Sequence, residues 1–186
     1  MGTDIHGVWQ KKTIQGWENI ESAYQQSRHY QLFAVLAGIR NGTGFAGVPT
    51  GQVITPISNP RGLPVDFQLN RTGYMGDHSY SWLSGEEMLH WFATAPIVIK
   101  TGVIDRQTYE TWDKISRPSS YCGDIWGKFV VKINDNEVEK NIQPNWTHIF
   151  CTWEAPLKEE LKYFFDEVDR LMKLHGEIRF VFGFDS

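Results

Sequence analysis

Two short polar segments of the sequence carry residue types that could do chemistry. The first contains Asp4 and His6, whose spacing places both side chains on one face if the segment is a strand. The second, residues 76–82, contains Asp77 and His78 beside several hydroxyl side chains. A carboxylate next to an imidazole can bind a divalent metal or act as an acid–base pair. We therefore expect a divalent-metal site of Asp4, His6, Asp77 and His78, and the alternative is a half-exposed polar strand face.

The 76–82 segment also suggests a ligand site. If the segment is extended, its side chains divide between two faces, with Asp77, Ser79 and Ser81 on one and His78, Tyr80 and Trp82 on the other. His78 could then be the general base for a serine nucleophile, although the G-x-S-x-G elbow of many serine hydrolases is missing. The alternative is a helix entry that uses its hydroxyls for turns and caps.

Two arginines border a stretch rich in glycine and proline. Arg40 and Asn41 lie at the end of an expected helix, and Arg61 lies within Pro-Arg-Gly-Leu-Pro. Guanidinium groups bind phosphate or carboxylate with a fork of donors, and glycine-rich backbone can approach a ligand closely. No Walker motif is present. The alternative is that Arg40 contacts the carbonyls of its own helix and that Arg61 pins the loop. The expected ligand-binding residues are Arg40, Asn41, Arg61, His78, Ser79, Ser81 and Trp82.

Hydrophobic periodicity predicts the elements that position these residues. Helices are expected over residues 29–40, 85–93, 106–116 and 157–175, with Ser27 capping the first, Gly42 ending it, and a capping box at Ser84-Gly-Glu-Glu87. Strands are expected over residues 3–11, 17–25, 97–104, 126–134, 146–153 and 177–184, with a hairpin turn at Asp135-Asn136.

The order of these elements predicts the fold class. We expect a single α+β domain over residues 1–186, with a mostly antiparallel sheet packed by three to four helices. The apolar strand 177–184 is expected at the centre of the sheet. Residues 41–82 should form a long, ordered glycine/proline loop and the ligand-binding segment.

Composition excludes several classes of protein. The 186 residues include 18 Lys and Arg against 22 Asp and Glu, a net charge of −4, so no overall positive charge attracts nucleic acid or an anionic membrane. No apolar run approaches the roughly 20 residues of a membrane span, and we expect no targeting segment. The two cysteines form no CxxC pair, which favours reduced thiols in a cytoplasmic protein.

Several unusual strings resemble an uncharacterised family of phage and prophage proteins. These strings are MGTDIHG, RNGTGFAGVPTG, PRGLP, MGDHSYSWL, SYCGDIWG and RFVFGFD, and the resemblance covers nearly the whole chain. It implies an accessory phage gene product in the bacterial cytoplasm. The family has no settled activity, so the resemblance assigns no catalytic residues.

Together these features favour a phage accessory protein that binds a small phosphate-bearing ligand of the nucleotide type. Arg40 and Arg61 would bind phosphate, and Trp82 or Tyr80 would stack on a base. Such a protein could sequester a host immune signal. Two alternatives stay open: a metal-dependent hydrolase or phosphodiesterase acting on such a ligand, and an inhibitor that binds a host protein. The oligomeric state, including a homo-oligomer, also stays open.

Overall fold

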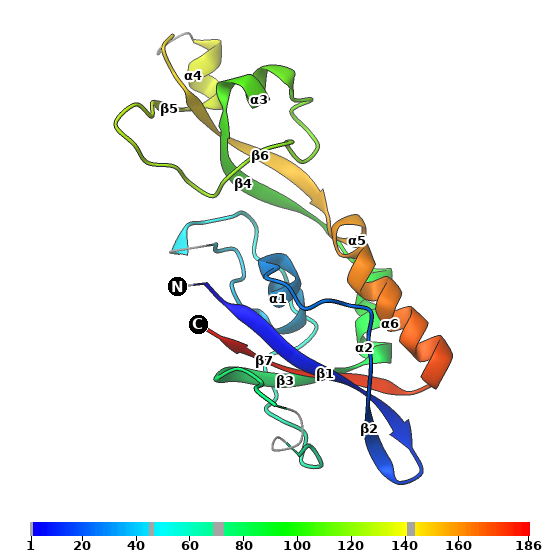
Figure 1. Cartoon of the computed structure of the whole chain (residues 1–186). Coiled ribbons are helices and arrows are strands. Elements are labelled where there is room, and N and C mark those ends of the chain that lie inside the picture. Colours follow the sequence, from blue (N-terminus) through cyan, green and yellow to red (C-terminus); the bar gives the residue numbers. More distant parts are fainter. Residues whose placement is uncertain (1, 45–46, 69–72, 141–143) are drawn as a thin grey trace. The chain divides into compact units, whose positions relative to one another are not determined.

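The computed structural model describes residues 2–44, 47–68, 73–140 and 144–186. Within these residues the chain forms seven strands and six helices (Figure 1), which confirms the predicted α+β class. The chain divides into two compact units, where the sequence predicts one domain. The first comprises Met1–Asn41, Ile54–Pro96 and Leu157–Ser186, and the second comprises Gly42–Val53 and Ile97–Pro156. Phe45 and Ala46 of the predicted loop lie outside the described residues.

The first unit is organised by a four-stranded sheet in which every pairing is antiparallel. The strand order is β2-β1-β7-β3, so the apolar β7 (Ile178–Asp185) is a central strand, as predicted. Its neighbours are β1 (Asp4–Thr13), β2 (Gly16–Ile20) and β3 (His78–Ser84).

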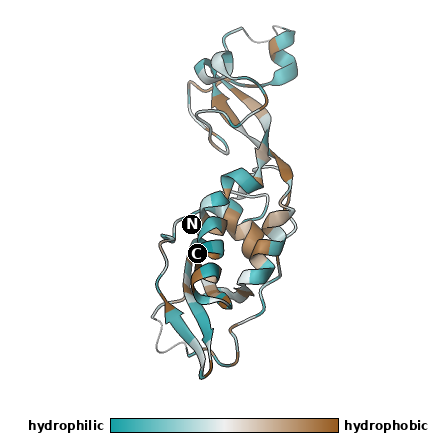
Figure 2. Cartoon of the chain, turned by 90° about the vertical axis from the view of Figure 1, so that its right-hand side faces the viewer, coloured by the Kyte–Doolittle hydropathy of each residue, from teal (hydrophilic) through white to brown (hydrophobic). Residues whose placement is uncertain are grey.

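Helices cover the face of this sheet that carries the phenylalanines of β7. These helices are α1 (Tyr30–Ala37), α2 (Gly85–Ala93), α5 (Leu157–Glu160) and α6 (Lys162–His175). Phe33 of α1 meets Phe184 edge-on at 5.2 Å between ring centroids, and Phe164 of α6 lies 6.0 Å from Phe180. Figure 2 shows that these helices carry both hydrophilic and hydrophobic residues, as expected for helices with one buried face.

The second unit has its own sheet and its own core. Strands β4 (Ile97–Asp105) and β6 (His148–Pro156) pair antiparallel, and the short β5 (Lys132–Asn134) pairs with β6 in parallel. Two short helices, α3 (Arg106–Thr111) and α4 (Asp135–Glu139), complete the unit. Its core consists of Ile104, Ile133, Trp146, Ile149, Cys151 and Trp153.

The strand and hairpin predicted near residue 130 are wrong. Only Lys132–Asn134 of the predicted strand 126–134 is extended as a strand, and Phe129 is 82% exposed. Helix α4 begins where the hairpin turn is predicted, because Asn134 and Glu137 form a capping box. The Asn134 amide donates to Glu137 Oε2 at 2.6 Å. A helix start therefore replaces the turn, and β5 reaches β6 in the parallel direction.

Three predicted helices differ from the structure at their ends. Helix α1 is capped by His29, whose Nδ1 accepts from the Leu32 amide, and it ends at Gly38 in the left-handed region (φ 71°). Helix α3 stops at Thr111 because Trp112 is extended. The predicted helix 157–175 is interrupted at Leu161 (φ −105°, ψ 5°), which divides it into α5 and α6.

Candidate functional site

Strand β7 brings together the two polar segments that are far apart in the sequence. Asp4 of β1 pairs with Asp185, and His78 of β3 pairs with Phe184. Both segments therefore lie at one end of the four-stranded sheet, beside the end of β7 (Figure 1). We call this region, where β1 and β3 begin and β7 ends, the sheet end.

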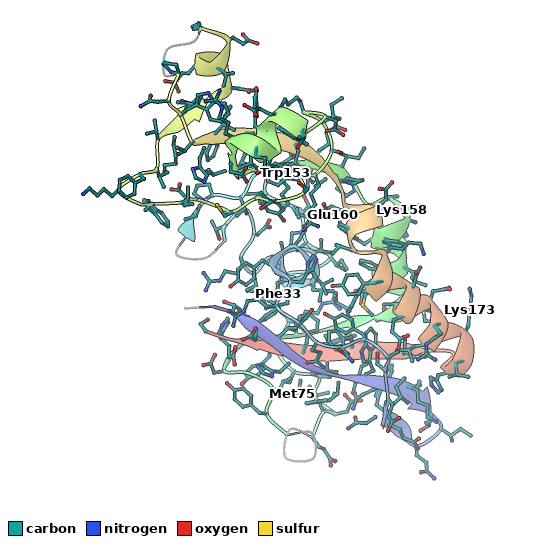
Figure 3. The ribbon with its side chains drawn as sticks, turned by 45° about the horizontal axis from the view of Figure 1, so that its top comes forward. Phe33, Met75, Trp153, Lys158, Glu160 and Lys173 are labelled. Carbon is teal, nitrogen blue, oxygen red and sulfur yellow. The ribbon has the colours of Figure 1, made fainter. Side chains whose placement is uncertain are left out.

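The two segments nevertheless point to opposite faces of the sheet. Directly paired residues of antiparallel strands share a face, and successive residues alternate between faces. Asp4 therefore shares a face with Asp185, whereas His78 shares the opposite face with Phe184. Phe33 of α1 packs on Phe184, and Figure 3 shows Phe33 and Met75 on opposite sides of the sheet. We call these the α1 side and the loop side.

On the loop side, His6 is paired with a carboxylate that sequence reasoning missed. His6 Nε2 lies 3.0 Å from Asp185 Oδ2, and both side chains are about one-third exposed. The His6 ring meets Tyr74 edge-on at 4.9 Å, and Tyr74 is exposed. This arrangement orients the imidazole as an acid–base group would be oriented.

Asp4 on the same side is already occupied by a cation. Arg28 Nε and Nη2 donate to the two Asp4 oxygens at 2.9 and 2.6 Å. This bidentate pair holds the pKa of the Asp4 carboxyl below its usual value. Both side chains are about half exposed, so the pair adds little to stability.

On the α1 side, polar groups form a row across three strands. Arg40 Nε donates to Thr3 Oγ1 at 2.8 Å, and Thr3 and Ser186 are the residues next to the terminal pair of β1 and β7, Asp4 and Asp185. Ser186 Oγ lies 2.8 Å from His78 Nε2, and Ser79 Oγ lies 2.9 Å from His78 Nδ1. We call Arg40, Thr3, Ser186, His78 and Ser79 the α1-side row.

Two members of the α1-side row have an unusual backbone conformation. Arg40 (φ 56°) and Ser79 (φ 53°) adopt the left-handed region, as does Lys114 in the second unit. Ser79 lies in a β-bulge between His78 and Ser81, so the simple alternation expected for an extended 76–82 segment does not hold. Left-handed non-glycine residues cost about 1–2 kcal/mol each and cluster at functional sites.

The other predicted phosphate ligand, Arg61, lies in a different cluster. Its guanidinium donates to Glu87 Oε1 at 2.6 Å and stacks over Trp82 at 4.9 Å from the ring. Its backbone amide donates to the buried Ser81 Oγ at 3.3 Å. Arg61, Ser81 and Trp82 thus hold residues 58–62 against the outer edge of β3, where the Gly62 amide bonds to Tyr80 O.

Asn41 is engaged with backbone rather than presented to a ligand. Its amide nitrogen donates to the Ile54 carbonyl at 2.6 Å, and its oxygen accepts from the Ile54 amide at 2.7 Å. This side chain therefore connects the two points where residues 42–53 leave and re-enter the first unit.

The four predicted metal ligands do not form one cluster. Asp77 Oδ1 lies 3.9 Å from His78 Nε2, but Asp4 and His6 are on the other face. Among residues 2–44, 47–68, 73–140 and 144–186, no three His, Cys, Asp or Glu side chains are arranged to hold a metal ion. Asp185, Ser186 and Thr3 carried no sequence signal, because only the strand register brings them to the sheet end.

Comparisons with known proteins identify no relative of the chain. Searches of protein-family models, curated proteins and solved structures find no match to the chain. Among its described helices, none combines the length and apolar character needed to cross a membrane.

Proposed function

We propose that the chain is a phage accessory protein that binds a small phosphate-bearing ligand, of the nucleotide type, at the α1-side row. The observation that carries the proposal is the gathering of hydrogen-bond donors in this row, which contains the Arg40–Thr3 bond and the Ser186–His78–Ser79 contacts. A guanidinium (Arg40), an imidazole (His78) and three hydroxyl groups lie along one face of the sheet end. Guanidinium groups, the N–H of an imidazole and hydroxyl groups are side-chain donors that phosphate oxygens accept from.

The neighbourhood of Arg40 supports this role. Its guanidinium lies 5.6 Å from the Tyr30 ring centroid and bonds to Thr3, so its position is well defined before a ligand arrives. An ordered donor loses less conformational entropy on binding than a free surface arginine would. Sequestration of a host nucleotide signal is the biological role we propose for this binding.

The predicted metal ligands lie on opposite faces of the sheet, which favours ligand binding over the metal-dependent hydrolase. A metal shared by Asp4 and His78 would have to reach both faces of the sheet, and Asp4 is neutralised by Arg28. The proposed phosphate ligand needs neither Asp4 nor a metal.

Thermal-shift screening and calorimetry with cyclic nucleotides and ADP-ribose derivatives test the proposal. The informative variant is Arg40→Asn, because asparagine tolerates the left-handed backbone and removes the guanidinium. Loss of one charge-assisted contact should weaken binding roughly 10- to 100-fold. The matched control is Arg61→Gln, which removes the arginine paired with Glu87 and should leave affinity unchanged.

The outcomes separate the proposal from its rivals. Absence of binding to any of these nucleotides, or equal weakening by both arginine variants, would count against the α1-side row. Stable capture of one host protein from lysate, with no nucleotide binding, would instead favour the host-protein inhibitor.

A further inference from the structure

Ser79 and His78 form a nucleophile–base pair within the α1-side row. Ser79 Oγ lies 2.9 Å from His78 Nδ1, within hydrogen-bond distance for proton transfer. We infer that Ser79 attacks the phosphorus of a phosphate ester and that the chain cleaves such esters at this site. The substrate class rests on the proposed function, because the α1-side row is what would bind the phosphate.

The second ring nitrogen of His78 is also engaged. His78 Nε2 lies 2.8 Å from Ser186 Oγ and 3.9 Å from Asp77 Oδ1. The Ser186 hydroxyl can accept from Nε2–H, and the Asp77 carboxylate on the same side of the ring favours a proton there, so both are compatible with the tautomer that carries its proton on Nε2. In that tautomer Nδ1 has the free lone pair that a general base needs, and it faces the Ser79 hydroxyl.

The backbone conformation at Ser79 differs from that of an ordinary strand residue. The β-bulge and the φ of 53° displace Ser79 from the regular alternation of β3. Ser79 and His78 are half-buried, whereas Ser81 on the same strand is fully buried and bonds to a loop amide. Bulges often redirect a side chain next to an active site.

The chemical step balances without a metal or an external reductant or oxidant. Ser79 Oγ forms a bond to phosphorus while its proton passes to His78 Nδ1. The bond from phosphorus to the leaving alcohol breaks, and His78 returns the proton to that alcohol. Water then attacks the phosphorus of the phosphoserine and gives a proton to His78 Nδ1. The bond from phosphorus to Ser79 Oγ breaks, and Nδ1 returns the proton to Oγ, which releases the phosphate and restores both residues.

A fluorophosphonate probe tests this inference on the full chain. Ser79 Oγ should displace fluoride from phosphorus, and peptide mass spectrometry should find the adduct on Ser79. Ser79→Gly should abolish labelling without backbone strain, because glycine adopts a positive φ freely. Ser81→Ala, which removes a serine of the same strand, should label at the wild-type rate. His78→Gln should slow labelling at least tenfold.

A second measurement follows turnover of bis(4-nitrophenyl) phosphate. The wild type should release 4-nitrophenol, and Ser79→Gly should lose this activity. Ser186→Ala should change the pH profile of the labelling rate, because Ser186 Oγ contacts the Nε2 atom of the base His78. A profile identical to the wild type would show that Ser186 does not position the base.

The failure of this inference differs from the failure of the proposed function. Nucleotide binding that depends on Arg40, with no adduct on Ser79, would overturn the nucleophile and leave the binding role intact. Labelling that persists in Ser79→Gly would also overturn it. An adduct on Ser79 in a chain that binds no nucleotide would support the nucleophile and overturn the proposed ligand.

Discussion

Asn41 and Ile54 are joined by two hydrogen bonds, of 2.6 and 2.7 Å, that reproduce with a side-chain amide the pairing of two backbone strands. All of residues 42–53 lies between these two positions and belongs to the second unit. One side chain therefore closes the first unit at the point where the chain leaves it.

Asn41→Ala should destabilise the backbone around Ile54. Ile54 is 2% exposed, so its amide and carbonyl would be left buried without these partners. An unsatisfied buried polar group costs about 1–3 kcal/mol. Hydrogen exchange at the Ile54 amide should accelerate accordingly. Asn59, an exposed asparagine in the same segment, gives the control variant Asn59→Ala, which should leave that exchange rate unchanged. Equal rates in both variants would show that the Asn41 pair contributes nothing.

Gly76→Ala should disrupt the sheet end by steric collision. Gly76 has a φ of 84°, and a Cβ there would collide with the backbone of Phe184. Gly73→Ala is the matched control, because Gly73 has a φ of 80° but has open space around its Cβ position. The control should cost about 1–2 kcal/mol for the left-handed backbone alone. The free energy of unfolding can be measured by urea denaturation, with hydrogen exchange of the β7 amides as the readout for the first unit. It should fall further in Gly76→Ala than in Gly73→Ala, and equal losses would refute the close approach.

The elements that sequence predicted well are those set by local signals. Ser84 caps α2, and Glu87 returns a hydrogen bond to its amide at 2.9 Å, as the capping-box pattern predicts. The strand around Phe182 was expected at the centre because a run of large apolar residues must be buried on both faces. Both signals depend on neighbours within a few residues.

The parts that sequence could not predict depend on long-range pairing. Asp4 meets Asp185 only because β1 and β7 align in one particular register, 181 residues apart in sequence. The bulge at Ser79 then places His78 and Ser81 on one face, which periodicity alone assigns to opposite faces. Composition marked Asp4, His6 and His78 as reactive types, but only the sheet separates them into two sites.

The buried thiol of Cys151 should be unreactive in the folded chain. Burial raises its pKa to about 11, and that of Cys122 is also raised, chiefly by burial. Thiolate is the reactive form, so alkylation by iodoacetamide at pH 8 should be slow until the second unit unfolds. Time-resolved mass spectrometry in buffer and in urea measures both rates. Rapid modification of Cys151 in buffer would contradict its burial in the core of the second unit.

The stability of the first unit should fall in acid through Glu167. This carboxylate accepts from Arg170 Nε at 2.7 Å, from Ser22 Oγ at 2.8 Å and from the Ala23 amide at 2.8 Å. These bonds, led by that of Arg170, lower its pKa to about 2 against an ordinary value of 4.5. Because the folded pKa is the lower one, the stabilisation is present above pH 4.5 and is lost as pH falls toward 2.

Glu167→Gln isolates this contribution. At pH 6 the wild type should be more stable by about 2 kcal/mol, less than the full shift implies because Arg170 is half exposed and screened. The difference should become much smaller near pH 2, because about half of the folded wild-type carboxyls are protonated there. Urea denaturation at the two pH values, with hydrogen exchange of the β7 amides as the readout, measures this difference in stability. Glu159→Gln, at an exposed position in α5, should show a small difference that does not change with pH. A wild-type advantage over Glu167→Gln that persisted undiminished at pH 2 would mean that the variant loses stability through the mismatched hydrogen bonds of its amide and not through the missing charge.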